Sequence, residues 1–250
     1  VWGRCLFQKA PPPEKANDFA LMQSVNKFQI KDMMSMITQI QAERLAALRE
    51  RIPAYINGKR LIHTLGVERE ITSLAGIYMP EREFELRCAA LLHDITKQLS
   101  LDEQLSLCDA FGIEYTERDK LTPKIFHAMT AVGVIRRDEP EFADEFVLSA
   151  VRYHTTGRAG MTLGEKLLYL ADYIEDTRTF PDCVELRRHF YSALGDAVSQ
   201  FDRDAVLRDT LILSFDMTIR GLIEDGTPVA HDTFEARNYL IEEKEFEKRK

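Results

Sequence analysis

Residues 88–97 read Cys88-Ala-Ala-Leu-Leu-His-Asp-Ile-Thr-Lys97, an apolar run that contains the charged doublet His93-Asp94. The window 83–97 is apolar enough to predict a central buried helix. A carboxylate in such a helix is costly unless it is paired or bound to a cation. Adjacent residues on a helix diverge by ~100°, so both can approach a metal only where the interior of a bundle curves around it. Asp94 and Lys97 share a face, and a metal-holding carboxylate beside an ammonium suits phosphate chemistry.

Helical spacing of apolar residues continues on both sides of this run, from about Lys31 onward. Few windows show the strict alternation of a half-buried strand, and no internal repeat is present. Gly157, Gly160 and Gly226 fall where helix ends are expected. The sequence therefore predicts an all-α helical bundle, with helices over 34–56, 59–78, 83–97, 101–111, 122–137, 141–156, 162–177, 183–198 and 203–225.

Residues 1–33 differ from the remainder, 34–250, which is predicted to form the main domain. Pro11, Pro12 and Pro13 block helix continuation, and the surrounding residues have the composition of a linker. The chain begins at Val1, as a fragment or a processed product would. We expect residues 1–33 to be an extension or linker, the end of something longer.

Composition and charge exclude several classes of protein. Acidic residues outnumber basic residues by 41 to 33, for a net charge of -8, which argues against a nucleic acid or a membrane surface as partner. No stretch approaches the ~18 to 20 apolar residues of a membrane span, and the N-terminus lacks the order of a signal peptide. The four cysteines form no C-x-x-C pair, so a reducing cytoplasm is the simplest expectation.

Two further polar residues repeat the anomaly of His93-Asp94. His63 lies in Leu61-Ile-His-Thr-Leu65, and Asp172 lies in Leu170-Ala-Asp-Tyr-Ile174. Alone, His63 reads as a satisfied core histidine, and Asp172 reads as a structural cap or ion pair. The signal is the order His, His-Asp, Asp, each in a separate apolar helix. Two imidazoles and two carboxylates suit Fe, Mn, Co or Zn better than Ca, and this set is the signature of the HD superfamily.

His127 and His154 lie between the doublet and Asp172 in the sequence. They are candidates either for ligands of a second metal or for hydrogen-bond donors to a substrate phosphate. The stretch Thr155-Thr-Gly-Arg158 after His154 supplies hydroxyls, a turn and a guanidinium, a composition that can cradle phosphate oxygens.

Several motifs together resemble one branch of the superfamily, the bacterial YqeK family of symmetrical diadenosine tetraphosphate (Ap4A) hydrolases. The resemblance covers about residues 40 to 240. Some relatives are fused to a nicotinate-nucleotide adenylyltransferase, so the extension is compatible with a junction remnant. The motifs are Lys59-Arg-Leu-Ile-His-Thr-Leu-Gly-Val67, Leu92-His-Asp-Ile-Thr-Lys97, Tyr153-His-Thr-Thr-Gly-Arg158, Gly160-Met-Thr-Leu163 and Ala171-Asp-Tyr-Ile-Glu175.

The resemblance also implies roles for particular residues. His63, His93, Asp94 and Asp172 would bind a transition metal, with iron favoured over Co, Mn or Zn. Asp94, Lys97 and His127 would be catalytic. Besides Asp94 and Asp172, the residues implied to contact substrate are Arg60, Lys97, His127, His154, Thr155, Arg178, Pro228, Val229, Ala230, His231, Asp232 and Thr233. Asp176 departs from the family, which usually has Pro there, so the helix before Arg178 is expected to run on.

The activity implied is metal-dependent hydrolysis of a dinucleoside tetraphosphate at the middle of its phosphate chain, giving two nucleoside diphosphates. The partner is then a small molecule, and a homodimer is compatible with it. Alternatives are another HD activity (5′-nucleotidase, deoxynucleoside triphosphohydrolase or guanosine-tetraphosphate hydrolase) and a non-catalytic nucleotide-binding HD domain.

Overall fold

A computed structural model describes residues 37–249 of the chain, so the predicted extension at 1–33 lies outside the described residues. Between 37 and 249 the chain forms helices and turns and no strand, which confirms the all-α prediction. The helices are α2 (Gln39–Arg51), α3 (Gly58–Tyr78), α4 (Glu83–Leu92), α5 (Leu101–Phe111), α6 (Phe126–Asp138), α7 (Glu145–Tyr153), α8 (Leu163–Ile174), α9 (Pro181–Asp196), α10 (Gln200–Glu224) and α11 (His231–Glu247). No helix in this part of the chain is both long and apolar enough to cross a membrane.

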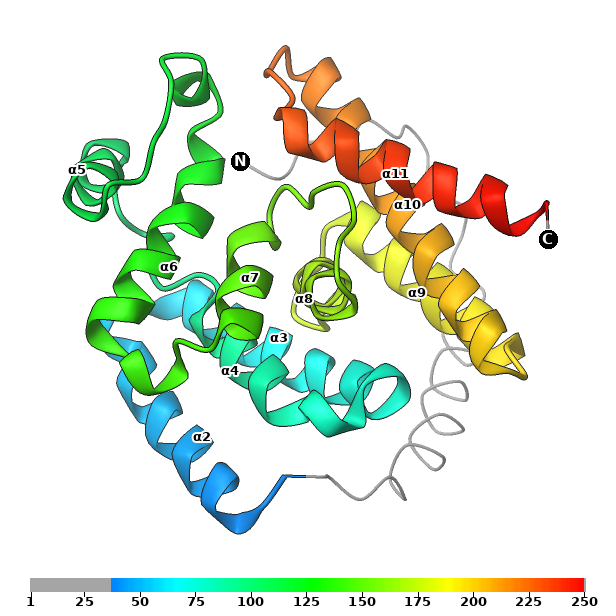
Figure 1. Cartoon of the computed structure of the whole chain (residues 1–250), viewed down its shortest axis with the longest axis horizontal. Helices are drawn as coiled ribbons and strands as arrows, with labels where there is room; N and C mark the ends of the chain where they lie inside the picture. The colour runs from blue at the N-terminus through cyan, green and yellow to red at the C-terminus, as the bar shows by residue number, and fades with distance from the viewer. Residues whose placement is uncertain (1–36, 250) are drawn as a thin grey trace.

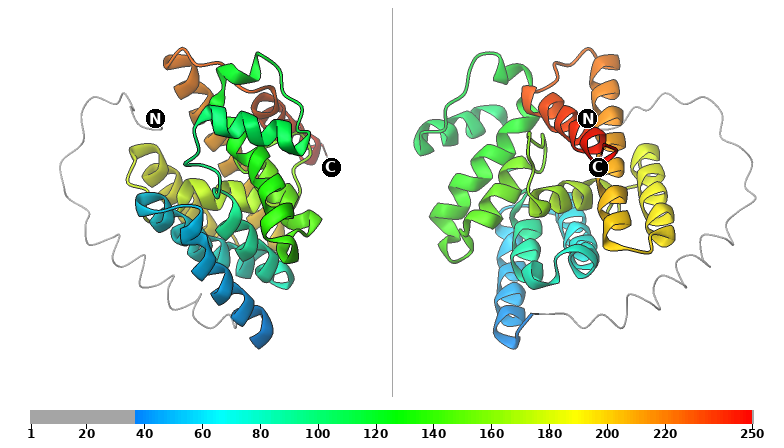
Figure 2. Two further views of the ribbon diagram at one scale, coloured as in Figure 1. Left: turned by 90° about the vertical axis from the view of Figure 1, so that its left-hand side faces the viewer. Right: turned by 45° about the vertical axis from the view of Figure 1, so that its right-hand side comes forward.

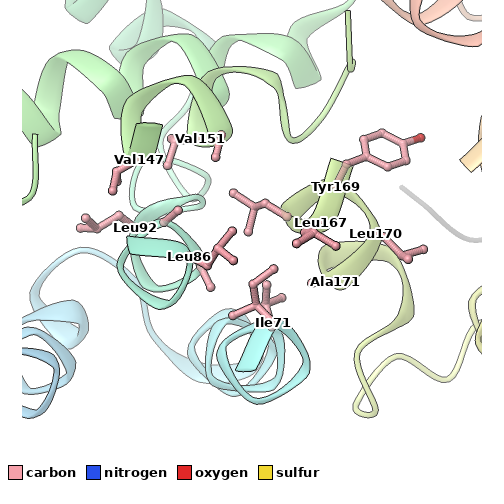
Figure 3. Close-up of a cluster of buried hydrophobic side chains, with 14 of the residues drawn as sticks. Ile71, Leu86, Leu92, Val147, Val151, Leu167, Tyr169, Leu170 and Ala171 are labelled. Carbon is pink, nitrogen blue, oxygen red and sulfur yellow. The ribbon is translucent and has the colours of Figure 1, made fainter. Parts of the chain in front are cut away.

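The helices pack in an order that centres on α8. Helix α8 contacts α3, α4 and α7 on one side and α9 and α10 on the other. Helices α5 and α6 extend the bundle beyond α7, and α11 covers α10 (Figures 1 and 2). The main core lies where α3, α4, α7 and α8 meet, and the buried side chains labelled in Figure 3 include Ile71, Leu86, Leu92, Val147, Val151 and Leu167.

Helix ends follow local signals that the sequence carries. Helix α8 begins at a capping box, in which the Thr162 side chain accepts from the backbone N–H of Glu165 and the Glu165 carboxylate accepts from the backbone N–H of Thr162. Such a cap stabilises a helix by about 1 kcal/mol. Helix α9 begins with Pro181, whose fixed φ and missing N–H are tolerated at the first helical position. These two signals fix the residues at which α8 and α9 begin.

Several helices are shorter than the sequence predicts, and the early ends of α4 and α8 change the surroundings of His93, Asp94 and Asp172. Helix α4 ends at Leu92, so His93 and Asp94 stand in a turn and not within a helix over 83–97. Helix α8 ends at Ile174 and does not reach 177, because Glu175 is extended, with ψ 150°. The expectation that the helix runs on past Asp176 is therefore wrong. The guanidinium of Arg187 instead donates to the freed carbonyl of Ile174.

Glu70 on α3 is a half-buried acid whose protonation is linked to folding. It accepts a hydrogen bond from the hydroxyl of Tyr191 on α9. Burial raises the pKa of Glu70 from 4.5 to about 7, although Tyr191 and Arg187 act in the opposite direction. The unfolded chain releases this proton near pH 4.5, whereas the folded chain keeps it until about pH 7. In that window the folded state binds more protons, so stability falls as pH rises.

We therefore expect Glu70→Gln to flatten the pH dependence of stability. The wild-type contribution is fully present below pH 4.5 and is lost through about pH 7, whereas the amide never ionises. Thermal unfolding followed by circular dichroism between about pH 4 and pH 8 tests this. The variant should gain stability relative to wild type as pH rises, and parallel curves would contradict the assignment.

Candidate metal centre and phosphate pocket

Five helices bring six polar residues to one point inside the bundle. Three of these residues follow the ends of helices, namely His93 and Asp94 after α4 and His154 after α7. Exposed fractions are 8% or less for all but Asp172, whose side chain is 20% exposed. The set is His63 from α3, His93 and Asp94 after α4, His127 from α6, His154 after α7 and Asp172 from α8.

The early end of α4 explains how neighbours such as His93 and Asp94 reach the same point. In a continuing helix their side chains would diverge by about 100°. In the turn, the Nε2 of His93 lies 3.3 Å from the Oδ2 of Asp94. The Nδ1 of His93 is 2.6 Å from the carbonyl of Ala90, which holds the ring in place. The turn therefore lets both side chains point to one place, as the sequence led us to expect from a curved bundle interior.

His63, His93, Asp94 and Asp172 form one face of the cluster. The Oδ1 of Asp172 lies 2.9 Å from the Nε2 of His63 and 3.7 Å from that of His93. The Oδ2 of Asp94 lies 3.8 Å from the Nε2 of His63. Ligand atoms of His63, His93 and Asp172 all fall within 4.8 Å of one another, close enough to hold one metal ion. The structure thus brings together all four residues predicted as metal ligands.

Hydrogen bonds on the outer sides of the rings decide which atoms face inward. His63 Nδ1 is 2.9 Å from the Oε1 of Glu175, and His93 Nδ1 faces a carbonyl. Both contacts assign the proton to Nδ1, so each Nε2 turns a lone pair inward. Neither Nε2 has a hydrogen-bond partner, although both are buried. Lone pairs and carboxylate oxygens that converge in this way fit a bound cation.

A second face of the cluster carries the remaining histidines and Lys97. The Oδ1 of Asp94 lies 3.2 Å from the Nε2 of His127 and 3.6 Å from that of His154. The Nζ of Lys97 lies 3.0 Å from His127 Nε2 and 3.9 Å from Asp94 Oδ1. The hydroxyl of Thr155 lies 3.0 Å from His154 Nε2. Asp94 therefore lies between the two faces: its Oδ2 faces His63 and His93, and its Oδ1 faces His127 and His154.

Electrostatics differ sharply between the groups of this second face. Burial by itself raises the pKa of Asp94, but His93 and Lys97 outweigh it and hold that pKa well below its usual range. Burial, together with the charge of Lys97, lowers the pKa of His127 to about 3, so the ring is neutral at neutral pH. Burial also lowers the pKa of Lys97. The face therefore combines an ionised carboxylate with neutral imidazole donors.

Two arginines flank the ligand carboxylates. The Nη1 of Arg60 donates to the Oδ2 of Asp94 at 2.6 Å, and the Nη2 of Arg178 donates to the Oδ1 of Asp172 at 2.7 Å. The Nε of Arg178 is buried and has no partner. Arg158, by contrast, turns away to pair with Glu165 at 3.0 Å, so the turn after His154 does not offer its guanidinium to the cluster.

The cluster opens into a cavity of about 610 Å³ that runs between α8, α9 and α10. That volume lies within the range of about 300–1,000 Å³ usual for small-molecule sites. Its lining combines the predicted Arg60, Asp94, Lys97, His154, Thr155, Asp172 and Arg178 with Lys124, Tyr169, Tyr173, Phe180, Pro181, Asp182, Cys183, Met217, Thr218, Gly221, Leu222 and Asp225.

The predicted stretch 228–233 follows Asp225, the last lining residue of this cavity along the chain. Pro228, Val229 and Ala230 form the turn after α10, and His231, Asp232 and Thr233 begin α11. Of the residues that the structure describes, the lining of the cavity reaches Asp225 and does not include this stretch. Its contact with a nucleotide stays a prediction.

Sequence reasoning missed two groups of residues. From the sequence, Glu175 was given no role beyond the last position of Ala171-Asp-Tyr-Ile-Glu175. A charged residue directly after an apolar helix could have indicated one. The apolar part of the cavity, which includes Tyr173, Phe180 and Leu222, gave no signal, because aromatic and aliphatic residues at helical spacing normally indicate core.

Comparison with known proteins agrees with this geometry. The family model of the HD domain matches residues 60–176. A Bacillus subtilis protein named symmetrical bis(5′-nucleosyl)-tetraphosphatase is 32% identical over 199 residues, covering 80% of this chain and 96% of the relative. A Halalkalibacterium halodurans protein of the same name is 30% identical, covering 76% of this chain and 93% of the relative.

The fold also matches a solved structure. A Clostridium acetobutylicum protein, described as a predicted HD superfamily hydrolase involved in NAD metabolism, superposes with a TM-score of 0.68 at 34% identity. The match covers 79% of this chain and 97% of the other. Motifs, fold and extended sequence similarity agree, and the chain belongs to the YqeK family of HD-domain symmetrical bis(5′-nucleosyl)-tetraphosphatases.

Proposed function

We propose that this chain is a metal-dependent hydrolase that cleaves diadenosine tetraphosphate symmetrically into two molecules of ADP. The observation that carries the proposal is the convergence of buried, unpartnered ligand atoms beside a cavity whose lining includes Arg60, Lys97, Lys124 and Arg178. Relatives of this chain are named symmetrical bis(5′-nucleosyl)-tetraphosphatases, which supports the choice of substrate.

His63, His93, Asp94 and Asp172 would hold the metal, which we assign as iron. Two imidazoles with two carboxylates suit Fe, Co, Mn or Zn, and the family resemblance favours iron. A bound transition metal supplies Lewis acidity and a nucleophilic water near neutral pH. The unpartnered Nε2 atoms of His63 and His93 support this ligand set.

The chain's own groups divide the remaining work. Asp94 orients the attacking water, since its second oxygen faces His127 at 3.2 Å and is held ionised. The Lys97 ammonium would counter charge that develops on the phosphoryl oxygens, and neutral His127, 3.0 Å from it, would donate a hydrogen bond to them. Arg178 lines the cavity and would offer phosphate its remaining N–H groups from the other side, while its Nη2 holds Asp172.

Binding of the nucleoside would use the far part of the cavity. Tyr173, Phe180 and Leu222 offer aromatic and aliphatic surface that suits a purine base. Arg60 and Thr155 contact the cluster at Asp94 and His154, and the stretch 228–233 would close the side near Asp225. Symmetrical cleavage follows if one nucleoside diphosphate half is held along the cavity while the metal centre meets its terminal phosphate.

Product identification tests this function directly. The purified protein, analysed for bound metal, is incubated with diadenosine tetraphosphate, and the nucleotides are separated by chromatography. Two ADP are expected, whereas ATP with AMP would contradict symmetrical cleavage. Hydrolysis only of a monophosphate, a deoxynucleoside triphosphate or guanosine tetraphosphate would favour another HD activity. Tight binding with no turnover would favour a non-catalytic domain.

We also infer a cytoplasmic, reducing location. Cys88, Cys108 and Cys183 are buried free thiols, and no disulfide joins them within the described part of the chain. Free thiols persist where the environment is reducing.

A further inference from the structure

Glu175 is a buried carboxylate directly behind the metal cluster. It follows the last residue of α8 and is 0% exposed. Its Oε1 lies 2.9 Å from the Nδ1 of His63, on the side of the ring opposite the cluster. Thr177 completes the site, since its backbone N–H donates to Oε2 at 2.7 Å and its hydroxyl donates to Oε1 at 2.8 Å. The Glu175 carboxylate therefore accepts from His63 and from two groups of Thr177.

Gly66 provides the space that this carboxylate occupies. It lies on α3 one turn after His63, and a Cβ there would fall 2.2 Å from the Oε2 of Glu175. Glycine inside a helix is less favourable than alanine, so its presence here requires a reason. The close approach of Glu175 is that reason.

Arg187, on α9, holds the backbone around Glu175 by hydrogen bonds. Arg187 donates to the carbonyl of Ile174 at 2.5 Å, to that of Glu175, and to that of Arg178 at 2.9 Å. These bonds satisfy the carbonyls that the end of α8 leaves free. The carboxylate therefore sits on a fixed backbone, and its position relative to His63 is set by packing.

We propose that Glu175 is a positioning residue that acts through His63, fixing its Nδ1–H tautomer and so presenting Nε2 to the metal. The inference rests on the proposed metal-dependent function and adds a residue to it. A carboxylate that accepts from the outer nitrogen of a ligating imidazole orients the ring and raises its basicity. Gly66 and Thr177 are then parts of the same arrangement, one providing room and the other providing hydrogen bonds.

Glu175→Gln tests the inference because the amide cannot reproduce the pattern. Its NH₂ group must face either the Nδ1–H of His63 or the N–H of Thr177, which places a donor against a donor. We expect the affinity of the metal-free protein for Co²⁺, titrated by visible absorption, to fall about 10- to 100-fold. Activity lost at limiting Co²⁺ should recover as Co²⁺ is raised, with KM for the dinucleotide unchanged.

Glu68→Gln is the matched control. Glu68, which lies on α3, is a buried carboxylate like Glu175, but it pairs with Arg49 and Arg87, away from the cluster. That variant should lower the melting temperature and leave Co²⁺ affinity unchanged, so the comparison separates positioning from structural support. Equal Co²⁺ affinity for Glu175→Gln and wild type would overturn the proposal.

Milder variants keep the test decisive if Glu175→Gln does not fold. Thr177→Val removes only the hydroxyl donor, and Gly66→Ala displaces the carboxylate through the added methyl group. Both should weaken Co²⁺ binding, and unchanged binding in both would overturn the proposal. A wild-type protein that binds no Co²⁺ or other divalent transition metal would instead contradict the proposed function.

Discussion

Asp94→Ala is expected to abolish metal binding and hydrolysis together. Asp94 is 1% exposed and is the only carboxylate of the described chain whose two oxygens face different histidines of the cluster, His93 on one side and His127 on the other. Loss of a residue behind a ligand already costs about 10- to 100-fold in affinity or activity, so loss of the ligand itself should exceed about 100-fold. Metal content by mass spectrometry and ADP release are the two measurements.

Asp176→Ala controls for the removal of a carboxylate. Asp176 lies just beyond α8, is exposed and pairs with Arg69 at the surface. Exposed pairs contribute about 0–1 kcal/mol to stability, so this variant should keep metal content and turnover. Retention of near-normal activity by Asp94→Ala would be incompatible with the proposed mechanism.

Lys97→Met is expected to lower kcat by roughly 10²- to 10³-fold while the metal stays bound, as for other groups that stabilise charge in a transition state. Its ammonium is 3.0 Å from His127 Nε2 and lines the cavity, whereas 3.9 Å separates it from the nearer oxygen of Asp94. The thioether has similar length and no charge. Steady-state kinetics with diadenosine tetraphosphate and metal analysis of the same sample measure both effects.

The contrast with Asp94→Ala separates charge stabilisation from metal binding. Lys120→Met is the control, since Lys120 is an ammonium in the loop before α6 that pairs with Glu117 and does not line the cavity. It should leave kcat unchanged. Parallel loss of metal and activity in Lys97→Met would show that Lys97 supports the ligand set and does not act on the phosphate.

Much of the cluster was accessible from the sequence because burying a charge is costly. Charged residues in apolar helical windows are rare without a partner, so His93, Asp94 and Asp172 stood out against their neighbours. The order of these residues and His63 then predicted a shared metal, and the fold brings ligand atoms of His63, His93 and Asp172 within 4.8 Å of one another, with Asp94 beside them. The helical class followed equally from the spacing of apolar residues.

Helix ends were less predictable, and they decide the direction of side chains. Periodicity extended the central helix to 97, but the chain turns after Leu92 and aims both His93 and Asp94 at the cluster. Similarly, Arg158 and Arg178 both looked suited to phosphate, yet only Arg178 lines the cavity. Local sequence cannot separate such pairs, because the choice depends on which carboxylate each guanidinium meets across the bundle.

The sequence by itself determined the helical class, the family and the metal-type residues, because each depends on composition, order and spacing along the chain. The tertiary structure alone decided that Glu175 stands behind His63, that Gly66 makes room for it, and that Tyr173, Phe180 and Leu222 extend the cavity. His63 and Glu175 are 112 residues apart, and their contact exists only because α3 packs against α8. The doublet at residues 93 and 94 indicated where a metal would bind, while packing between distant helices brought the other residues of the site around it.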